Sequence, residues 1–313
     1  MRNYLSIIIA VVVVASVAYV TLGTPKQTTT EQPTVQKTEA DIGSFTRQRS
    51  CARLPHFLKQ KGISQPVLID LSQEHYKGVA LLYGQHLRQA LHPKAWERFE
   101  HFGTYALDGS GNIYLAPMPY ISILPTTFSL QTNIYKLDTQ TGALSIWMHF
   151  DDVKPSASNP YGIISLVYDC DDKTLWVSAI DQSDYTSQKG RIYHIDTKTK
   201  RIIDTYEGFD ALTLSLLRTS KGKFLLAGSA RDSGVHAFAI TSKGLQPPSK
   251  LFTLPDDKMH VRKIKVKANN TLQLQAIPFS YTLIVETGRQ NRTFYQAHKH
   301  TNDAAWDVVK VTQ

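Results

Sequence analysis

The segment Tyr105-Ala-Leu-Asp-Gly-Ser-Gly-Asn-Ile-Tyr-Leu115 holds two short apolar stretches separated by a tight polar turn. Similar hairpin patterns return three times, at residues 166–177, 215–226 and 264–274. The spacings between equivalent points are 61, 50 and 48 residues, measured along Asn112, Lys173, Lys223 and Thr271. A hairpin recurring at this period indicates a repeat architecture, and a β-propeller blade is the unit that fits it best.

Each hairpin is followed by two more apolar stretches, so every repeat contains four predicted strands. The clearest copies are residues 133–144 and 191–202, which share an Ile-Tyr pair and an Asp-Thr turn. Near the ends, Val67–Leu71 lacks a strand before it, and 305–311 adds one strand after the last repeat. We therefore expect an all-β, five-bladed β-propeller of four-stranded blades, whose ring is closed by Trp306–Val311. A six-bladed propeller is the alternative count if residues 41–66 contain further strands, and an irregular antiparallel sandwich is the alternative fold.

The N-terminus contains an uncharged apolar run from Leu5 to Leu22, preceded by Arg2. As a helix the run would be about 27 Å long, close to the hydrocarbon thickness of a bilayer. We expect 1–23 to be a transmembrane anchor with the C-terminal domain outside the cytoplasm, as the positive-inside rule predicts. Cleavage as a signal segment, which would leave a secreted or periplasmic protein, is the alternative.

Residues 24–50 are mostly Thr, Gln, Pro, Glu and Lys, so we expect a disordered tether between the anchor and a propeller over 51–313. Cys51 and Cys170 are the two cysteines. We expect two buried, unpaired thiols. A single disulfide between them is the alternative if the domain is exported.

The net charge of +9 is concentrated toward the C-terminus. For an exported domain a solvated basic face is the simplest explanation, and a role in adhesion or envelope scaffolding through that face is a further hypothesis. We expect no nucleic-acid partner and a monomer.

The stretch Leu175-Trp-Val, continued by Gly190-Arg-Ile-Tyr-His-Ile-Asp-Thr, resembles blades of the NHL, SMP-30/gluconolactonase and yellow-like propellers. The resemblance covers repeats two to four and implies the fold. Lactonases of that group hold a divalent metal such as calcium above the channel. No motif here matches their ligands, so the cofactor stays unassigned and no catalytic residue is carried over.

A propeller has two faces that differ in chemistry here. The turn face carries the first-to-second and third-to-fourth strand turns, while the loop face carries the connections between blades and the second-to-third strand loops. Carboxylates, imidazoles and aromatic rings collect on the loop face. The predicted ligand-binding residues are His101, Tyr120, Tyr161, Asp181, Tyr185, Asp210, Asp232 and His260.

Two functions fit this distribution. The first is a membrane-tethered extracytoplasmic propeller that binds a small molecule, glycan or protein through its acidic and aromatic loop face. The alternative is a metal-assisted hydrolase of the lactonase or glycosidase kind, with Asp210, His260 and Asp303 at the channel mouth as acid/base groups or ligands. Loop Asp and His residues that cap turns and face water would serve neither function.

Overall fold

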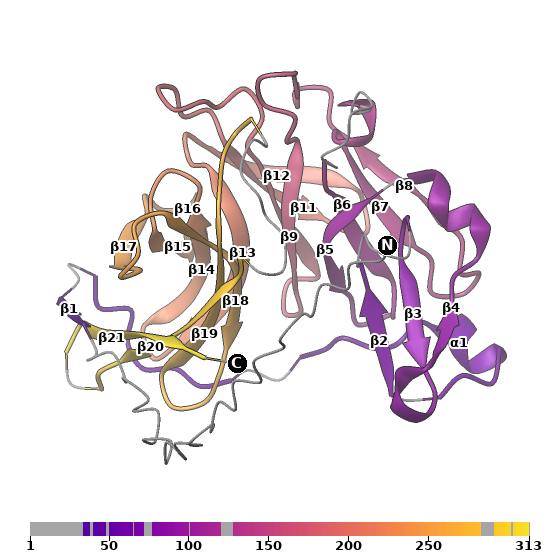
Figure 1. The fold of residues 1–313 in the computed structure, drawn as a ribbon, viewed down its shortest axis with the longest axis horizontal. Coiled ribbons are helices and arrows are strands. Elements are labelled where there is room, and N and C mark those ends of the chain that lie inside the picture. The colour runs from indigo at the N-terminus through magenta and orange to yellow at the C-terminus, as the bar shows by residue number, and fades with distance from the viewer. Residues whose placement is uncertain are drawn as a thin grey trace, which may run out of the picture. The chain divides into compact units, whose positions relative to one another are not determined.

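A computed structural model describes residues 34–37, 40–47, 50–64, 66–71, 77–99, 101–119, 128–282, 291–301 and 303–312. These residues form five antiparallel sheets that stand side by side (Figure 1). The predicted membrane anchor lies outside them. In the described part of the chain, no helix has the length and apolar character needed to span a bilayer.

The sheets follow one another along the chain as the blades of a five-bladed propeller. The first holds β2 (Val67–Asp70), β3 (Ala80–Tyr83) and β4 (Gln89–Leu91). The second holds β5 (Phe102–Leu107), β6 (Ile113–Pro117), β7 (Asn133–Leu137) and β8 (Leu144–His149). The third holds β9 (Ile163–Asp169), β10 (Thr174–Ala179), β11 (Arg191–Asp196) and β12 (Arg201–Glu207).

The last two sheets follow in the same order along the chain. The fourth holds β13 (Ala211–Thr219), β14 (Gly222–Ser229), β15 (Gly234–Thr241), β16 (Gly244–Leu245) and β17 (Ser249–Thr253). The fifth holds β18 (Met259–Val266), β19 (Thr271–Pro278), β20 (Thr293–Lys299), β21 (Ala305–Val311) and the edge strand β1 (Thr34–Lys37). Helix α1 (His56–Gln60) and the short 3₁₀ turns η1 (Gln85–Leu87), η2 (Lys94–Phe99) and η3 (Phe128–Leu130) lie in the connections.

Alternating side chains bind the blades together, because successive residues of a strand point to opposite faces of its sheet. On β10, Val177 packs in the core shared with the second blade, while Trp176 packs in the core shared with the fourth. On β14, Leu225 packs in the core shared with the third blade, while Leu226 packs in the core shared with the fifth. The middle strands are therefore buried on both faces, which is why their sequences read as continuous apolar runs.

The opening hairpin is confirmed as the inner half of the second blade. Strands β5 and β6 pair from Leu107 and Ile113 outward. The buried Asp108 side chain accepts hydrogen bonds from the backbone N–H groups of Ser110 and Asn112 at 2.9 and 2.8 Å, and this fixes the turn.

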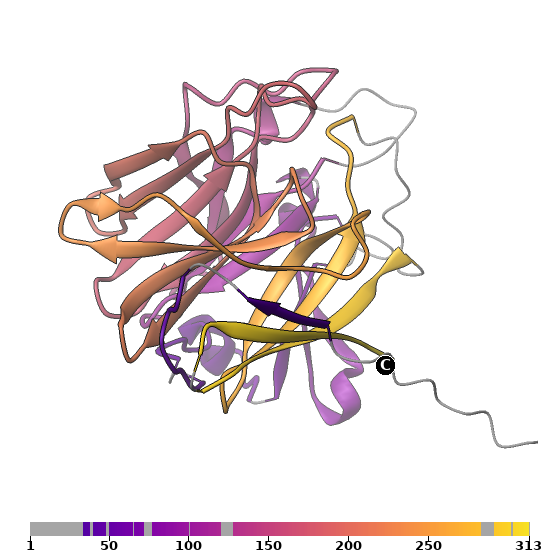
Figure 2. The same cartoon turned by 90° about the vertical axis from the view of Figure 1, so that its left-hand side faces the viewer.

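The predicted closure of the ring by Trp306–Val311 is wrong. Strand β21 pairs with β20 as the fourth strand of its own blade and receives β1 on its other edge, as Figure 2 shows. Trp306 and Val308 are buried in the core between the fourth and fifth blades. Because this strand is already paired, the β2–β4 sheet has three strands in the described part of the chain.

The segments 41–47 and 50–57, which we call the strap, lie across the turn face in the lower part of Figure 1. It contacts the inner hairpin turns of four blades in succession. Phe45 N–H donates to Asn270 Oδ1 at 2.6 Å, Ser44 N–H donates to Ser220 Oγ at 3.1 Å, and Arg53 N–H donates to the Asp108 carbonyl at 3.3 Å. Between the last two contacts, Cys51 forms a disulfide with Cys170.

Two sequence-based expectations fail at the strap. The cysteines are paired, so the prediction of free thiols is wrong, because the strap brings Cys51 onto the turn that carries Cys170. The predicted tether reached residue 50, whereas Ile42 and Phe45 are buried and Phe45 stacks on Trp306 at 6.1 Å. Two apolar side chains within a polar segment are enough to anchor it. The tether residues before Thr34 lie outside the described part.

Candidate functional site

The inner strands of four blades carry a β-bulge at equivalent positions. The register with the second strand skips one residue in each of β5, β9, β13 and β18. We call these four residues the bulge ring: Gly103, Ile164, Leu212 and Arg262. Because a bulge leaves its residue outside the ladder and re-aims the side chain, these residues are placed differently from their neighbours on the strand.

Arg262 spans the bulge ring. Its Nη1 donates to the Leu212 carbonyl at 2.8 Å and its Nη2 donates to the Ile164 carbonyl at 3.3 Å. A Cβ atom on Gly103 would lie 3.0 Å from Nη2, so the glycine leaves the room that the guanidinium occupies. The side chain is 8% exposed, and burial lowers the pKa of Arg262 to about 10, so it is still charged at neutral pH.

Four aromatic side chains form a continuous series that ends at the surface of the loop face. The rings of Tyr161 and Phe279 are 5.4 Å apart, those of Phe279 and Tyr281 are 5.1 Å apart, and those of Tyr281 and Tyr185 are 5.5 Å apart. We call this the aromatic row. Tyr161 and Tyr281 are buried, and Tyr185 is 67% exposed although its hydroxyl donates to Ser280 Oγ at 2.8 Å.

Asp210 ties three loops together beneath this row. Its Oδ1 accepts from the Ser183 hydroxyl at 2.6 Å and from the Gly190 N–H at 2.8 Å, while its Oδ2 accepts from the Tyr281 hydroxyl at 2.7 Å. Burial raises the pKa of Asp210, against the effect of these donors. The side chain has no exposed surface, so it supports the aromatic row from below and cannot touch a ligand.

The other predicted loop-face carboxylates are also engaged within the protein. Asp181 is fully buried and accepts from Arg191 Nη2 through both oxygens at 2.8 Å. Asp232 pairs with Lys250 Nζ at 2.6 Å and with His236 Nε2 at 3.3 Å. Although burial opposes ionisation, these two partners hold the pKa of Asp232 well below its usual range. The loop face is therefore less acidic toward solvent than its composition indicates.

The candidate catalytic residues do not come together. Asp210 and His260 lie at the loop-face ends of their blades, whereas Asp303 lies in the turn between β20 and β21 on the turn face. There its carbonyl accepts from Lys299 Nζ at 2.8 Å, and Lys299 also pairs with Asp41 of the strap. The error follows from the misassigned last strand, which moved Asp303 to the wrong face.

The imidazole candidates are placed as follows. His260 Nδ1 lies 3.3 Å from the Ser229 carbonyl, its ring contacts Phe279 at 5.8 Å, and burial is the main cause of its lowered pKa. His101 is buried immediately before β5. Tyr120 lies outside the described residues. Among those described, no group of three or more His, Cys, Asp or Glu side chains is arranged to hold a metal ion.

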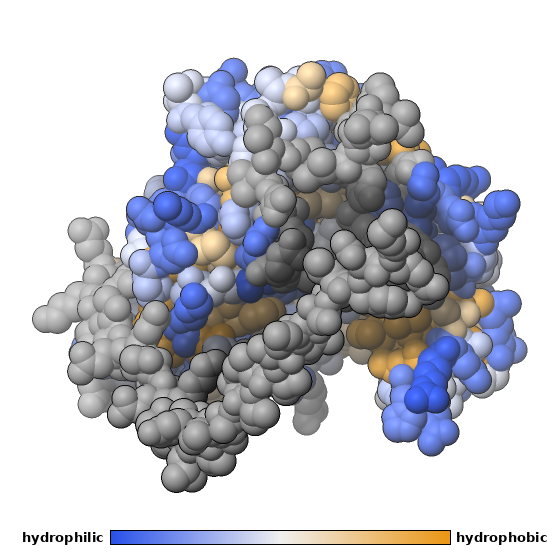
Figure 3. Space-filling view, in the orientation of Figure 1, coloured by the Kyte–Doolittle hydropathy of each residue, from blue (hydrophilic) through white to orange (hydrophobic). Residues whose placement is uncertain are grey.

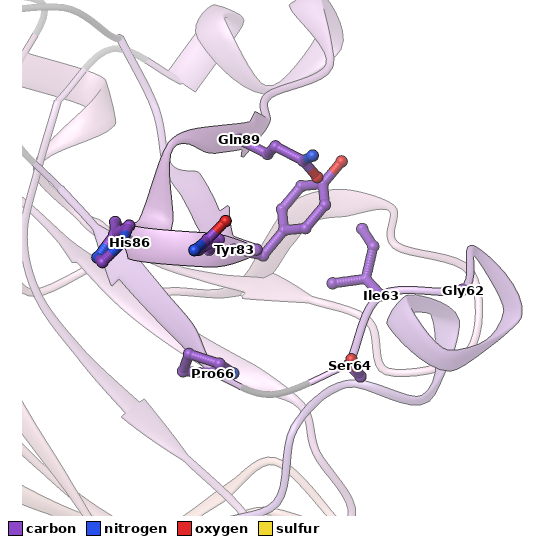
Figure 4. Close-up of a pocket in the computed structure, with 9 residues that line it drawn as sticks. Gly62, Ile63, Ser64, Pro66, Tyr83, His86 and Gln89 are labelled. Carbon is purple, nitrogen blue, oxygen red and sulfur yellow. The ribbon is translucent and has the colours of Figure 1, made fainter.

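A shallow pocket of about 540 Å³ lies beside the β2–β4 sheet and is separate from the aromatic row. Figure 4 shows Tyr83, Gln89 and Ile63 along one side of it. None of the predicted site residues lines this pocket. Sequence reasoning also missed Arg262, because nothing in an alternating strand pattern marks the position of a bulge.

Comparison with known proteins shows no matching family model and no matching curated protein. Among solved structures, luciferin-regenerating enzyme is 12% identical, with a TM-score of 0.43 and coverage of 90% of this chain and 95% of that one. A glucose dehydrogenase is 13% identical, with a TM-score of 0.36 and coverage of 79% and 75%. TolB from Acinetobacter baumannii is 12% identical, with a TM-score of 0.37 and coverage of 82% and 67%. These scores are low, so the description of the fold rests on the strand pairing itself.

Proposed function

We propose that the protein is a membrane-tethered, extracytoplasmic recognition protein that binds a ligand or protein partner through the aromatic row of its loop face. The observation that carries this proposal is that Tyr185 is both exposed and fixed in position. A large aromatic side chain that is 67% exposed and yet held in place by its neighbours is suited to recognition. Tyrosines of this kind commonly dominate binding energies.

Tyr185 is held from three directions. Its hydroxyl bonds to Ser280, its ring meets the edge of Tyr281, and its carbonyl accepts from Arg231 Nη2 at 3.2 Å. The Asp184 carboxylate accepts from the N–H groups of Thr186 and Ser187, both at 2.7 Å, which fixes the loop itself. Since little side-chain freedom is left to lose, binding at this position has a low entropic cost.

The exposed surface favours a localised contact over a broad apolar one. The face drawn in Figure 3 is mainly hydrophilic where its surface is coloured, and apolar surface occurs there in separate patches. The exposed large apolar side chains among the described residues are Leu68, Tyr105, Ile146, Tyr185, Ile202 and Ile203. Tyr185 is the most exposed of these and belongs to the aromatic row.

Export of the domain is supported by two features. Disulfides persist in oxidising compartments outside the cytoplasm, and Cys51 is paired with Cys170. The run from Leu5 to Leu22 is long enough to anchor the chain. Alkaline phosphatase fused after Gln313 should be active in intact cells, because that enzyme requires an oxidising compartment. An inactive fusion of normal abundance would contradict export.

The binding proposal is tested with a photo-crosslinking amino acid placed at Tyr185 of the full-length protein in cells. Ile146, which is 51% exposed on the outer strand β8, is the matched control position. We expect a discrete adduct from position 185 that position 146 does not give, or a glycan retained by the purified protein on an array and lost in Tyr185→Ala. Equal labelling from both positions together with an unselective array would refute the proposal.

The hydrolase alternative has no comparable support. It requires Asp210, His260 and Asp303 at one channel mouth. Asp303 lies instead on the turn face, between β20 and β21, and Asp210 is fully buried. A role of the basic turn face in adhesion is also less favoured. Part of that charge is paired, as in the contacts of Lys223 with Asp172 at 2.8 Å and of Lys221 with Asp41 at 2.7 Å.

A further inference from the structure

The central feature of the bulge ring is a buried positive charge. Arg262 is only 8% exposed, and its two hydrogen bonds to described residues are to backbone carbonyls, which are neutral. In the described part of the chain, no Asp or Glu side chain pairs with it. Transfer of an uncompensated charge out of water is costly, and buried charges in proteins are usually paired.

The two carbonyls occupy only some of the N–H donors of the guanidinium. A guanidinium has about five N–H donors in a planar fork, of which the Leu212 and Ile164 carbonyls take two. The remaining donors form no hydrogen bond to any other residue that the structure describes. The residue keeps 8% of its surface exposed to solvent.

The surroundings of Arg262 are also positive. The pKa of Lys263, the next residue of β18, is lowered by burial and by the charges of Arg262 and Arg292. The ring members Ile164 and Leu212 belong to the same apolar cluster as Tyr161 and Tyr281. Low-dielectric walls around like charges strengthen the attraction of an anion.

We propose that the bulge ring is a binding site for a small oxyanion, the carboxylate or phosphate group of a small molecule, which pairs with the unused donors of Arg262. Arginine suits this task because its planar fork matches two oxygens of either group. The bulge in β18 places the guanidinium among the ring carbonyls, and the absence of a side chain on Gly103 leaves room for the guanidinium itself. The proposal rests on Arg262 and not on Tyr185, so its test can fail without affecting the function proposed above.

The test measures the melting temperature of the full-length protein in sodium phosphate, in sodium acetate and in sodium chloride at matched ionic strength. We expect a saturable rise with at least one oxyanion, of about 5 °C or more at roughly 100 Kd. A response to phosphate alone would identify a phosphate ligand, and a response to acetate alone a carboxylate ligand. Identical behaviour in all three salts would overturn the proposal.

The variant Arg262→Met removes the charge at similar length and should abolish the oxyanion response, whereas Arg262→Lys should retain part of it. The control Arg218→Met alters an arginine of the turn face whose side chain is 50% exposed, and its response should equal that of the wild type. An unchanged response in Arg262→Met would refute the assignment. If that variant does not fold, equilibrium dialysis of the wild type with radiolabelled phosphate and with labelled acetate decides. One saturable site supports the proposal, and the lack of saturable binding of either anion refutes it.

Discussion

Loss of the disulfide between Cys51 and Cys170 should weaken the propeller more than any other change to the strap. The bond joins residues 119 positions apart, so it restricts a large part of the unfolded chain. The chain-entropy relation gives about 5 kcal/mol at 25 °C for a loop of this length, and native disulfides typically contribute about 2–4 kcal/mol. We expect Cys51→Ser/Cys170→Ser to lose about 2–5 kcal/mol of unfolding free energy.

The measurement is equilibrium unfolding in urea, followed by tryptophan fluorescence, with and without reductant. Reductant should bring the wild type to the midpoint of the double serine variant and leave that variant unchanged. Ala52→Ser, an exposed change next to the disulfide in the strap, should match the wild type. A double serine variant within about 1 kcal/mol of the wild type would show that the strap is held by its other contacts and would refute the reasoning.

Three further changes probe the strap, a loop-face imidazole and the packing around Asp210. The pKa of Asp41 is held far below its usual value, chiefly by the hydrogen bond from Lys221. Asp41→Asn should therefore cost about 1 kcal/mol in urea unfolding at pH 7, after allowance for the exposure of the pair. This difference should shrink as the pH falls below about 4, because the carboxylate of the unfolded chain takes up its proton there while that of the folded protein stays ionised. Burial lowers the pKa of His260, so the stability gained by keeping it neutral is present above about pH 6.5 and is lost on acidification; His260→Gln should flatten the fall in melting temperature between pH 7.5 and 5.5. Gly190→Ala would place a methyl group 2.4 Å from Asp210 Oδ1 and should cost about 1–3 kcal/mol by thermal unfolding, whereas Gly109→Ala, with no atom closer than 3.8 Å, should be nearly neutral.

The blade repeat could be predicted from the sequence because it depends on local patterns. The Tyr105–Leu115 hairpin has apolar alternation on both sides of an Asp-Gly-Ser-Gly turn, and period-2 alternation with turn residues is enough to specify a β-hairpin. Four such hairpins at similar spacing indicate blades, and the five sheets confirm that prediction. The exposure of Tyr185 on the loop face also agrees with its predicted position after β10.

The partners of the terminal segments could not be read from the chain. Residues 305–311 alternate equally well for an inner or an outer strand, and only the pairing of β21 with β20 places Asp303 on the turn face. Likewise, the polar composition around Ile42 and Phe45 gives no sign that these two side chains pack into the core between the fourth and fifth blades. Strand order and strap docking are long-range properties, so local periodicity does not determine them.

For the candidate sites too, the sequence predicted some features and only the tertiary structure decided others. The sequence predicted that Tyr161, Tyr185 and Asp210 lie on one face, because the face of a loop residue follows from its position in the repeat. Only the tertiary structure shows that Asp210 is sealed beneath Tyr281 while Tyr185 stays exposed, because burial depends on which loops meet above each residue. Arg262 reads as one more cation in a basic strand, and the bulge that re-aims it exists only in the pairing of β18 with β19.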